Sequence, residues 1–199
     1  ITVYNGIDLK RFNSSEDKKR INDKLICLSI GRLNVQKDYF NLIEAISLLD
    51  NSILNKVQFL IAGEGELKSE IENRIHKLNL GDNVKLLGRR SDVPQLLNKA
   101  DFFILSSKHE GLPTVLIEAM ACKCFVIATD CGGSAEIMQH TGILVPKQDH
   151  HALADALNRA FNLDQQCIIQ NNIAARKIVE SKFSMENSVN QWLGLYENH

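Results

Sequence analysis

The stretch DFFILSSKHEGLPTVLIEAMACKCFVIATD, residues 101–130, decides the fold that we predict for this chain. It begins with an apolar run at 101–107, ends with another at 124–130, and has an almost wholly apolar helical segment between them. Runs that are apolar throughout are typical of strands buried on both faces, as in parallel sheets. A strand, a helix and a second strand in this order predict the crossover unit of a parallel sheet.

The same alternation continues on both sides of this stretch. The other predicted strands are 25–31, 57–63, 84–88 and 141–146. The predicted helices between strands include 37–50, 66–80 and 91–100, and Gly81 is the expected C-cap of the second of them. We therefore predict an α/β fold with a doubly wound parallel sheet of about six strands. Ligands bind to such sheets at the carboxyl ends of the strands, near a switch in strand order.

Composition narrows the range of partners and compartments. The 199 residues fit one domain with a core of its own. A net charge of -1 does not suggest nucleic acid as a partner, and no apolar run approaches the ~18 residues of a transmembrane segment. The five cysteines form no CxxC pair, and we expect them to be small core residues in a reducing cytosol. No HExxH, DxD, GxSxG or GxxxxGK[ST] motif occurs, so no metal site is predicted.

Two carboxylates bracket the central helix, eight residues apart: Glu110 before it and Glu118 within it. Pro113 suits the first helical turn, where no N–H partner is lost. A buried carboxylate needs donors, so Glu118 requires protein groups or the hydroxyls of a ligand. At ~1.5 Å per residue, eight residues span roughly 12 Å, which fits a ligand running from a sugar through a diphosphate to a ribose. The alternative is a buried helix with one salt-bridged glutamate.

Two basic residues follow the first strand. Arg32 comes directly after Gly31, and Lys37 opens the next helix. A lysine at a helix N-terminus opposes the macrodipole unless an anion binds there as well. A planar guanidinium and a point charge together suit a diphosphate. The alternative is a solvated Lys37 and an Arg32 bridged to a surface carboxylate.

Glycines follow two other strands. Gly63-Glu64-Gly65 favours a plain strand-to-helix turn, because the last glycine of the dinucleotide-binding fingerprint is missing. The backbone of Gly132-Gly133 could approach a ligand closely or could simply cap a helical turn.

Several motifs, taken in order, resemble the C-terminal domain of family-four retaining glycosyltransferases. They are VYNGID, GRL…QK, AGEGE, ADFFILSS…EGLPTVLIEAMA, VIATDCGG and TGILV, and they cover about residues 5–161. That family has the GT-B architecture of two facing Rossmann-like domains. The resemblance implies a linker at 1–20, a Rossmann-like core at 21–163 and C-terminal helices at 164–199, with the N-terminal acceptor domain absent.

The resemblance also implies a role for each site residue. Glu110 is the catalytic residue that contacts the transferred sugar, Glu118 binds the ribose, and Arg89 lies beside the base. The diphosphate is assigned to Arg32, Lys37 and the start of the helix, namely Gly111, Leu112, Pro113 and Thr114. The surrounding donor-site loops contribute Gly31, Gly63, Glu64, Gly132 and Gly133.

The activity implied is transfer of a sugar from a nucleoside diphosphate sugar to an acceptor, with the anomeric configuration kept and without a metal or other cofactor. The expected pathway is glycan or surface polysaccharide synthesis, and the glycan or lipid-linked acceptor is expected on the missing domain. We expect a cytoplasmic protein, peripheral at the inner membrane face only through that domain, and a fragment that is inactive alone. Half of a nucleotide-sugar epimerase and a non-catalytic nucleotide-sugar-binding module remain the alternatives.

Two local features complete the expectations. Lys123, Cys124 and Phe125 replace the glycine and proline that the family usually has after the central helix, and a left-handed non-glycine there costs roughly 1 kcal/mol. In GT-B enzymes the end of the chain often crosses back to the other domain. Trp192 and Tyr196 are therefore expected to expose apolar surface.

Overall fold

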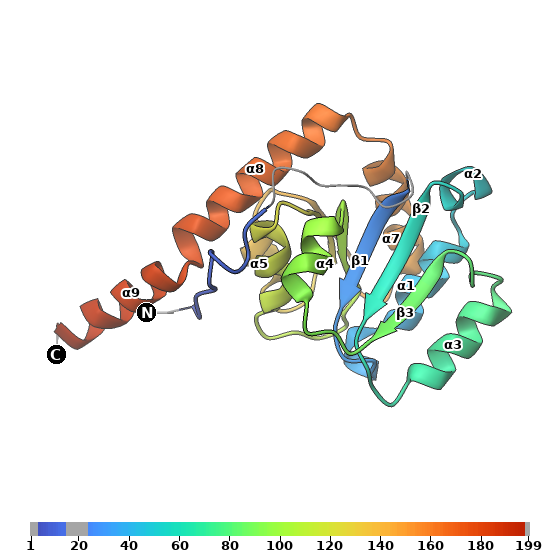
Figure 1. Cartoon of the computed structure of the whole chain (residues 1–199), viewed down its shortest axis with the longest axis horizontal. Helices are drawn as coiled ribbons and strands as arrows, with labels where there is room; N and C mark the ends of the chain where they lie inside the picture. The colour runs from blue at the N-terminus through green and yellow to red at the C-terminus, as the bar shows by residue number, and fades with distance from the viewer. Residues whose placement is uncertain (1–3, 15–23, 198–199) are drawn as a thin grey trace.

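A parallel sheet with helices on both faces forms the body of the protein (Figure 1). The computed structural model describes residues 4–14 and 24–197. The strands are β1 Leu25–Ile30, β2 Val57–Ala62, β3 Val84–Gly88, β4 Phe102–Leu105, β5 Phe125–Thr129 and β6 Ile143–Val145. Their order is β3-β2-β1-β4-β5-β6, and every neighbouring pair is parallel. The predicted six-stranded, doubly wound sheet is confirmed.

Most of the helices lie in two layers, one on each face of the sheet. The helices are η1 Val35–Lys37, α1 Tyr39–Ser47, α2 Asn51–Leu54, α3 Lys68–Lys77, α4 Val93–Lys99, α5 Thr114–Ala121, α6 Ser134–Met138, α7 His150–Phe161, α8 Gln165–Lys182 and α9 Met185–Glu197. One core joins the sheet to α1, α3 and α7. A second core on the opposite face joins it to α4, α5, α6 and α8.

Alternate residues of each central strand enter the two cores. Cys27 of β1 and Phe102 of β4 lie in the first core, and Leu28 and Phe103 lie in the second. Both faces of these strands are therefore buried, which explains why they are apolar throughout. Strand β1 has β2 on one side and β4 on the other, so the strand order switches between β1 and β4. This is the position at which a doubly wound sheet binds ligands.

The helices differ from the sequence predictions at the end of α3 and in the presence of α2. Gly81 is not the C-cap of α3, because the helix ends at Lys77 with Leu78 as its C-cap, and Asn79 takes the left-handed conformation, with φ of 56°. Asparagine tolerates that conformation better than most residues, so the turn needs no glycine. The short helix α2 was not predicted. Lys123 has a φ of 54°, which confirms a left-handed non-glycine residue after α5.

None of the five cysteines, all of which lie in the described residues, forms a disulfide. Four of them are buried core residues, as predicted: Cys27, Cys122, Cys124 and Cys131. The prediction is wrong for Cys167, which is exposed near the start of α8, a helix that only partly faces the core.

The described part of the predicted linker, residues 4–14, is held against residues 183–185, where α8 ends and α9 begins. The N–H of Ile7 donates to the carbonyl of Phe183 at 2.8 Å, and the N–H of Met185 donates back to Ile7 at 3.1 Å. A Cβ on Gly6 would lie 2.5 Å from the Cα of Met185, so only glycine fits this approach. Residues 1–3 and 15–20 of the predicted linker lie outside the described residues.

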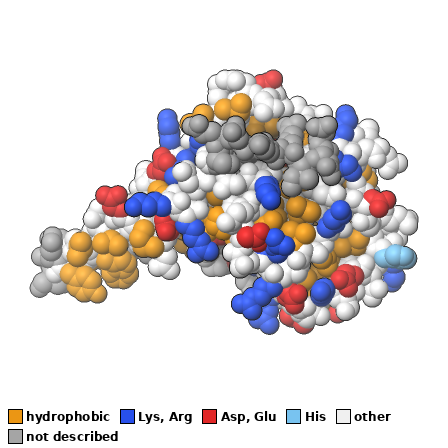
Figure 2. All heavy atoms as spheres, in the orientation of Figure 1, with side chains coloured by type: hydrophobic (Ala, Val, Ile, Leu, Met, Phe, Trp, Pro, Cys, Tyr) orange, Lys and Arg blue, Asp and Glu red, His pale blue; other side chains and the backbone are white. Residues whose placement is uncertain are grey.

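Helix α9 extends from the body and carries an exposed apolar stripe (Figures 1 and 2). Its members are Met185, Val189, Trp192, Leu193 and Tyr196. Trp192 is 48% exposed and Tyr196 is 75% exposed, which confirms the expected apolar surface. No helix in the described parts of the chain has the length and apolar character needed to cross a membrane.

Candidate functional site

An ion pair between Lys37 and Glu110 occupies the switch point of the sheet. Lys37 follows β1 and Glu110 follows β4, yet the Nζ of Lys37 lies 2.5 Å from Oε1 of Glu110. The two side chains are 18% and 10% exposed. Gly31 makes room for this pair, because a Cβ there would lie 2.9 Å from Cε of Lys37. The structure therefore brings together two of the predicted site residues, one cation and one carboxylate.

Buried hydroxyl groups hold both partners of this pair. Ser107 Oγ donates to Oε1 of Glu110 at 2.7 Å, and Ser106 Oγ donates to the backbone carbonyl of Lys37 at 2.9 Å. Thr129 Oγ1 donates to the carbonyl of Ser107 at 2.7 Å. All three hydroxyl residues are at most 1% exposed. None of the three was a predicted site residue, although polar residues at the ends of apolar strands are a signal that could have found them.

The loops after β1 and β4 form one connected unit. The N–H of Lys108 donates to the carbonyl of Gln36 at 2.8 Å, and Nε2 of Gln36 donates to the carbonyl of His109 at 2.9 Å. Lys108 Nζ lies 3.5 Å from Oδ1 of Asp38. Asp38 has a φ of 49°, and a strained left-handed residue persists only where its surroundings hold it. These contacts fix the separation of Lys37 and Glu110.

Glycines allow the neighbouring loops to touch through their backbones. A Cβ on Gly132 would lie well under 3.0 Å from the carbonyl oxygen of Glu110, and the N–H of Gly133 donates to the carbonyl of Gly111 at 2.8 Å. Gly133 is also the N-cap of α6. The predicted donor-site glycines therefore support the loop that carries Glu110.

The N-terminus of α5 is open to an anion. Pro113 is its N-cap, one residue before the predicted first turn, and no side chain caps the helix. Gly111 and Thr114 are exposed at the end of the helix where its dipole is positive. Pro113 has no N–H and cannot donate as the resemblance implied. Its carbonyl instead accepts from the N–H of Leu116 at 2.9 Å.

Glu118 lies half-buried on α5. Burial raises the pKa of its carboxyl group, and the charge of Arg11 partly opposes this shift. Within residues 4–14 and 24–197, no hydrogen bond or ion pair to the Glu118 carboxylate is present. Arg11 acts on Glu118 through its charge alone, so the described residues form no salt bridge of the kind that the structural alternative requires, and a ligand hydroxyl remains a suitable donor.

This environment predicts a pH-dependent affinity. If ribose hydroxyls donate to Glu118, the ionised form binds better, so the affinity for a nucleoside diphosphate should rise as pH increases through the raised pKa of Glu118. Glu118→Gln should weaken binding roughly ten-fold at neutral pH, because bonds to charged groups contribute ~1.5–3 kcal/mol. Calorimetric titrations of both proteins at several pH values, with the corresponding 2′-deoxynucleoside diphosphate as the control ligand, measure this. An unchanged affinity in a folded variant would return Glu118 to a structural role.

Three other predicted residues lie away from the ion pair. Arg32 is 73% exposed and its Nε lies 3.7 Å from Oε2 of Glu66, which is the surface contact named above as the alternative. Glu64 and Arg89 are exposed near the carboxyl ends of β2 and β3. No hydrogen bond or ion pair among the described residues joins them to Lys37 or Glu110. Their roles in holding a diphosphate and a base stay predictions.

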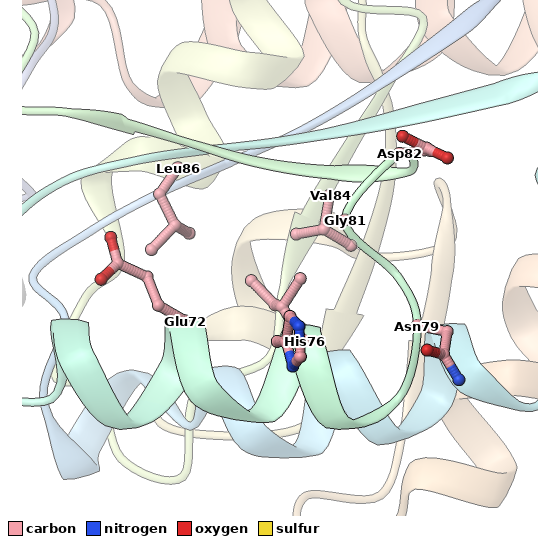
Figure 3. A pocket seen from close by; sticks show the side chains of 8 residues that line it. Glu72, His76, Asn79, Gly81, Asp82, Val84 and Leu86 are labelled. Carbon is pink, nitrogen blue, oxygen red and sulfur yellow. The ribbon is translucent and has the colours of Figure 1, made fainter.

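A separate hollow lies along the edge strand β3 and helix α3 (Figure 3). Its lining consists of Glu72, Ile75, His76, Asn79, Gly81, Asp82, Val84 and Leu86. None of the predicted site residues lines it. In the described ranges, no group of three or more His, Cys, Asp or Glu residues could hold a metal ion.

Comparison with known proteins gives one family. The family model described as "Glycosyl transferases group 1" matches residues 10–177. Two relatives from Campylobacter jejuni are named as N-acetylgalactosaminyltransferases that act on undecaprenol diphosphate-linked sugars. The first is 36% identical and covers 76% of this chain and 41% of that protein. The second is 34% identical and covers 82% of this chain and 44% of that protein.

Solved structures share the fold over nearly the whole chain. HepE from Anabaena, in complex with UDP and glucose, has a TM-score of 0.89 at 24% identity and covers 99% of this chain and 56% of that one. Sucrose-phosphate synthase from Thermosynechococcus elongatus has a TM-score of 0.88 at 28% identity, covering 98% and 51%. The C-terminal domain of LpcC from Francisella tularensis has a TM-score of 0.80 at 24% identity, covering 90% and 100%. The chain spans about half the length of the curated relatives it matches.

Proposed function

Because the chain belongs to the group 1 glycosyl transferases, we propose that it binds the nucleoside diphosphate sugar of a retaining glycosyltransferase. The observation that carries this proposal is the Lys37–Glu110 pair at the switch point of the sheet. A cation there can bind a diphosphate, and a carboxylate beside it can contact the sugar attached to that diphosphate. The open N-terminus of α5 lies next to Glu110 in the chain and adds N–H donors for the same anion.

The chemical task of these groups is to stabilise the leaving diphosphate. Negative charge develops on it as the bond to the sugar breaks, and preorganised cations and N–H donors at that position lower the barrier. Lys37, Arg32 and the N-terminus of α5 supply this charge without a metal in our proposal. Glu110 then contacts the sugar and Glu118 the ribose. Calorimetric titration of this chain with a nucleoside diphosphate, with and without EDTA, tests whether binding of the donor needs a metal.

The proposed pathway is synthesis of a glycan or surface polysaccharide. Relatives are named for undecaprenol diphosphate-linked sugars, teichuronic acid and amylovoran. We infer that the acceptor, a glycan or a lipid-linked sugar, binds to a second domain, for which the greater length of these relatives leaves room. The 199-residue chain alone then binds donor but transfers no sugar, because the acceptor is not oriented against it.

Calorimetry with UDP, GDP and ADP, and with the corresponding nucleosides, tests this function. We expect one diphosphate to bind and its nucleoside to bind much more weakly, because the phosphates meet the basic residues. Arg32→Ala should lower the affinity for the diphosphate more than the affinity for the nucleoside, and this loss of affinity should shrink in high salt. The absence of binding by all three diphosphates would contradict the proposal. Equal losses for nucleoside and diphosphate would remove Arg32 from the site.

A further inference from the structure

The contacts of the Glu110 carboxylate are unequal. Lys37 Nζ, at 2.5 Å, and Ser107 Oγ, at 2.7 Å, both bind Oε1. No donor from the described residues reaches Oε2. One oxygen is therefore held from the protein side, and the other is free to accept from a ligand. Because the carboxylate is planar and rigid, holding Oε1 in place also sets the direction in which Oε2 points.

The two donors to Oε1 differ in whether they also bind the ligand. Lys37 is the cation that we propose for the diphosphate, so a bound donor competes with Glu110 for its ammonium group. No ligand competes with Glu110 for Ser107, because Ser107 is fully buried. Its hydroxyl is the contact that persists when the ammonium group turns toward phosphate.

Ser107 is itself fixed at its backbone. It follows β4 by two residues, and its carbonyl accepts from Oγ1 of Thr129, at the end of β5, at 2.7 Å. Thr129 is also fully buried. The position of the Ser107 hydroxyl is therefore set by two central strands of the sheet, and a preorganised contact loses no freedom when the ligand binds.

We propose that Ser107 is a positioning residue, which holds Glu110 by Oε1 so that Oε2 faces a hydroxyl of the donor sugar. This inference rests on the proposed function, because it needs Glu110 to contact the sugar. It predicts that Ser107 contributes to the affinity for the sugar part of the donor and not to the affinity for the nucleoside diphosphate part. A serine that only fills the core would affect both parts alike, through stability.

A double-mutant cycle tests the inference on this chain. The variants are Ser107→Ala, Glu110→Ala and the pair together, and the probes are UDP with UDP-glucose, UDP-galactose and UDP-N-acetylgalactosamine. If GDP is the diphosphate bound, GDP and GDP-mannose replace them. The matched control is Ser188→Ala, which removes a buried hydroxyl that donates to the carbonyl of Tyr4 at 2.6 Å, outside the site.

We expect Ser107→Ala to lower the affinity for the sugar nucleotide that binds best by about ten-fold and to leave the affinity for the free diphosphate unchanged. In the Glu110→Ala background, Ser107→Ala should have no further effect on either affinity. The control Ser188→Ala should leave the affinity for both ligands unchanged. Equal losses for both ligands, or the same loss in both backgrounds, would overturn the inference. A wild-type chain that binds neither ligand refutes the proposed function instead. If Glu110→Ala leaves the sugar nucleotide unaffected, Glu110 makes no sugar contact and the role of Ser107 is wrong as well.

Discussion

Gly63→Ala is expected to destabilise the domain by about 3 kcal/mol, the upper range for a strained backbone position. A Cβ on Gly63 would lie well under 3.0 Å from the carbonyl oxygen of Gly31, and the φ of +157° disfavours any side chain. The clash is with backbone, which cannot rotate away as a side chain can. Gly31 in turn lies beneath the side chain of Lys37, so nucleotide binding should fall with stability. Urea denaturation measures the first effect and calorimetry the second.

Gly81→Ala is the matched control for this prediction. No atom lies within 4 Å of the Cβ position of Gly81, and its φ is not positive. Alanine there should be neutral or stabilising by up to about 1 kcal/mol, because it restricts the unfolded chain. Similar denaturation midpoints for Gly63→Ala and the wild type would show that the β1 and β2 loops can separate without cost.

The sheet could be predicted from the sequence because two cores impose a simple rule on its strands. Where both faces are buried, neighbouring residues such as Leu28 and Cys27 must both be apolar, whichever face each meets. Helix ends follow weaker rules. Gly81 was the expected C-cap of α3, yet Asn79 takes the left-handed conformation two residues earlier, because both residue types are tolerated there.

The candidate site could be predicted only in part. The sequence places Lys37 after one strand and Glu110 after another, and parallel strands bring both to one edge. Their direct contact depends on β1 lying beside β4, and strand order is not contained in the local pattern. The role of Ser107 was missed for a similar reason. The direction of its hydroxyl depends on backbone positions that two different strands set.

The sequence does not indicate which of the two basic residues, Arg32 or Lys37, faces the switch point of the sheet. Both are basic residues within one loop, and either could have faced the switch point. The stem of Lys37 passes over Gly31 toward Glu110, whereas Arg32 extends to Glu66 at the surface. Packing therefore selects between two residues that the pattern treats alike. A bound diphosphate could still draw Arg32 inward, so its role stays a prediction.

The exposed stripe on α9 differs from the rest of the structure, in which large apolar side chains are mostly buried. A row of five apolar residues on one helix typically marks an interaction surface. The start of the described chain lies against the same helix, because the hydroxyl of Ser188 donates to the carbonyl of Tyr4. That the helix crosses to a second domain stays a prediction.

Lys37→Met is the second substitution with a large expected effect, because it removes the cation beside a carboxylate that is 10% exposed. Ser107 then remains as the described donor to Oε1. Removing one partner of a buried pair costs about 3 kcal/mol, most of it from the charge left behind. The loss should appear as a lower urea midpoint. Affinity for a nucleoside diphosphate should also fall at least ten-fold, because a charge-assisted contact is lost.

The double variant Lys37→Met/Glu110→Gln separates these two effects. With the carboxylate neutral, no uncompensated charge remains, so most of the lost stability should return. The diphosphate affinity should stay low, because the cation is still absent. Glu110→Gln alone should keep diphosphate binding, since its lysine is released from the ion pair. If the double variant is as unstable as the sum of the two single variants, the Lys37–Glu110 pair contributes no coupling. If it binds diphosphate normally, Lys37 does not bind the donor.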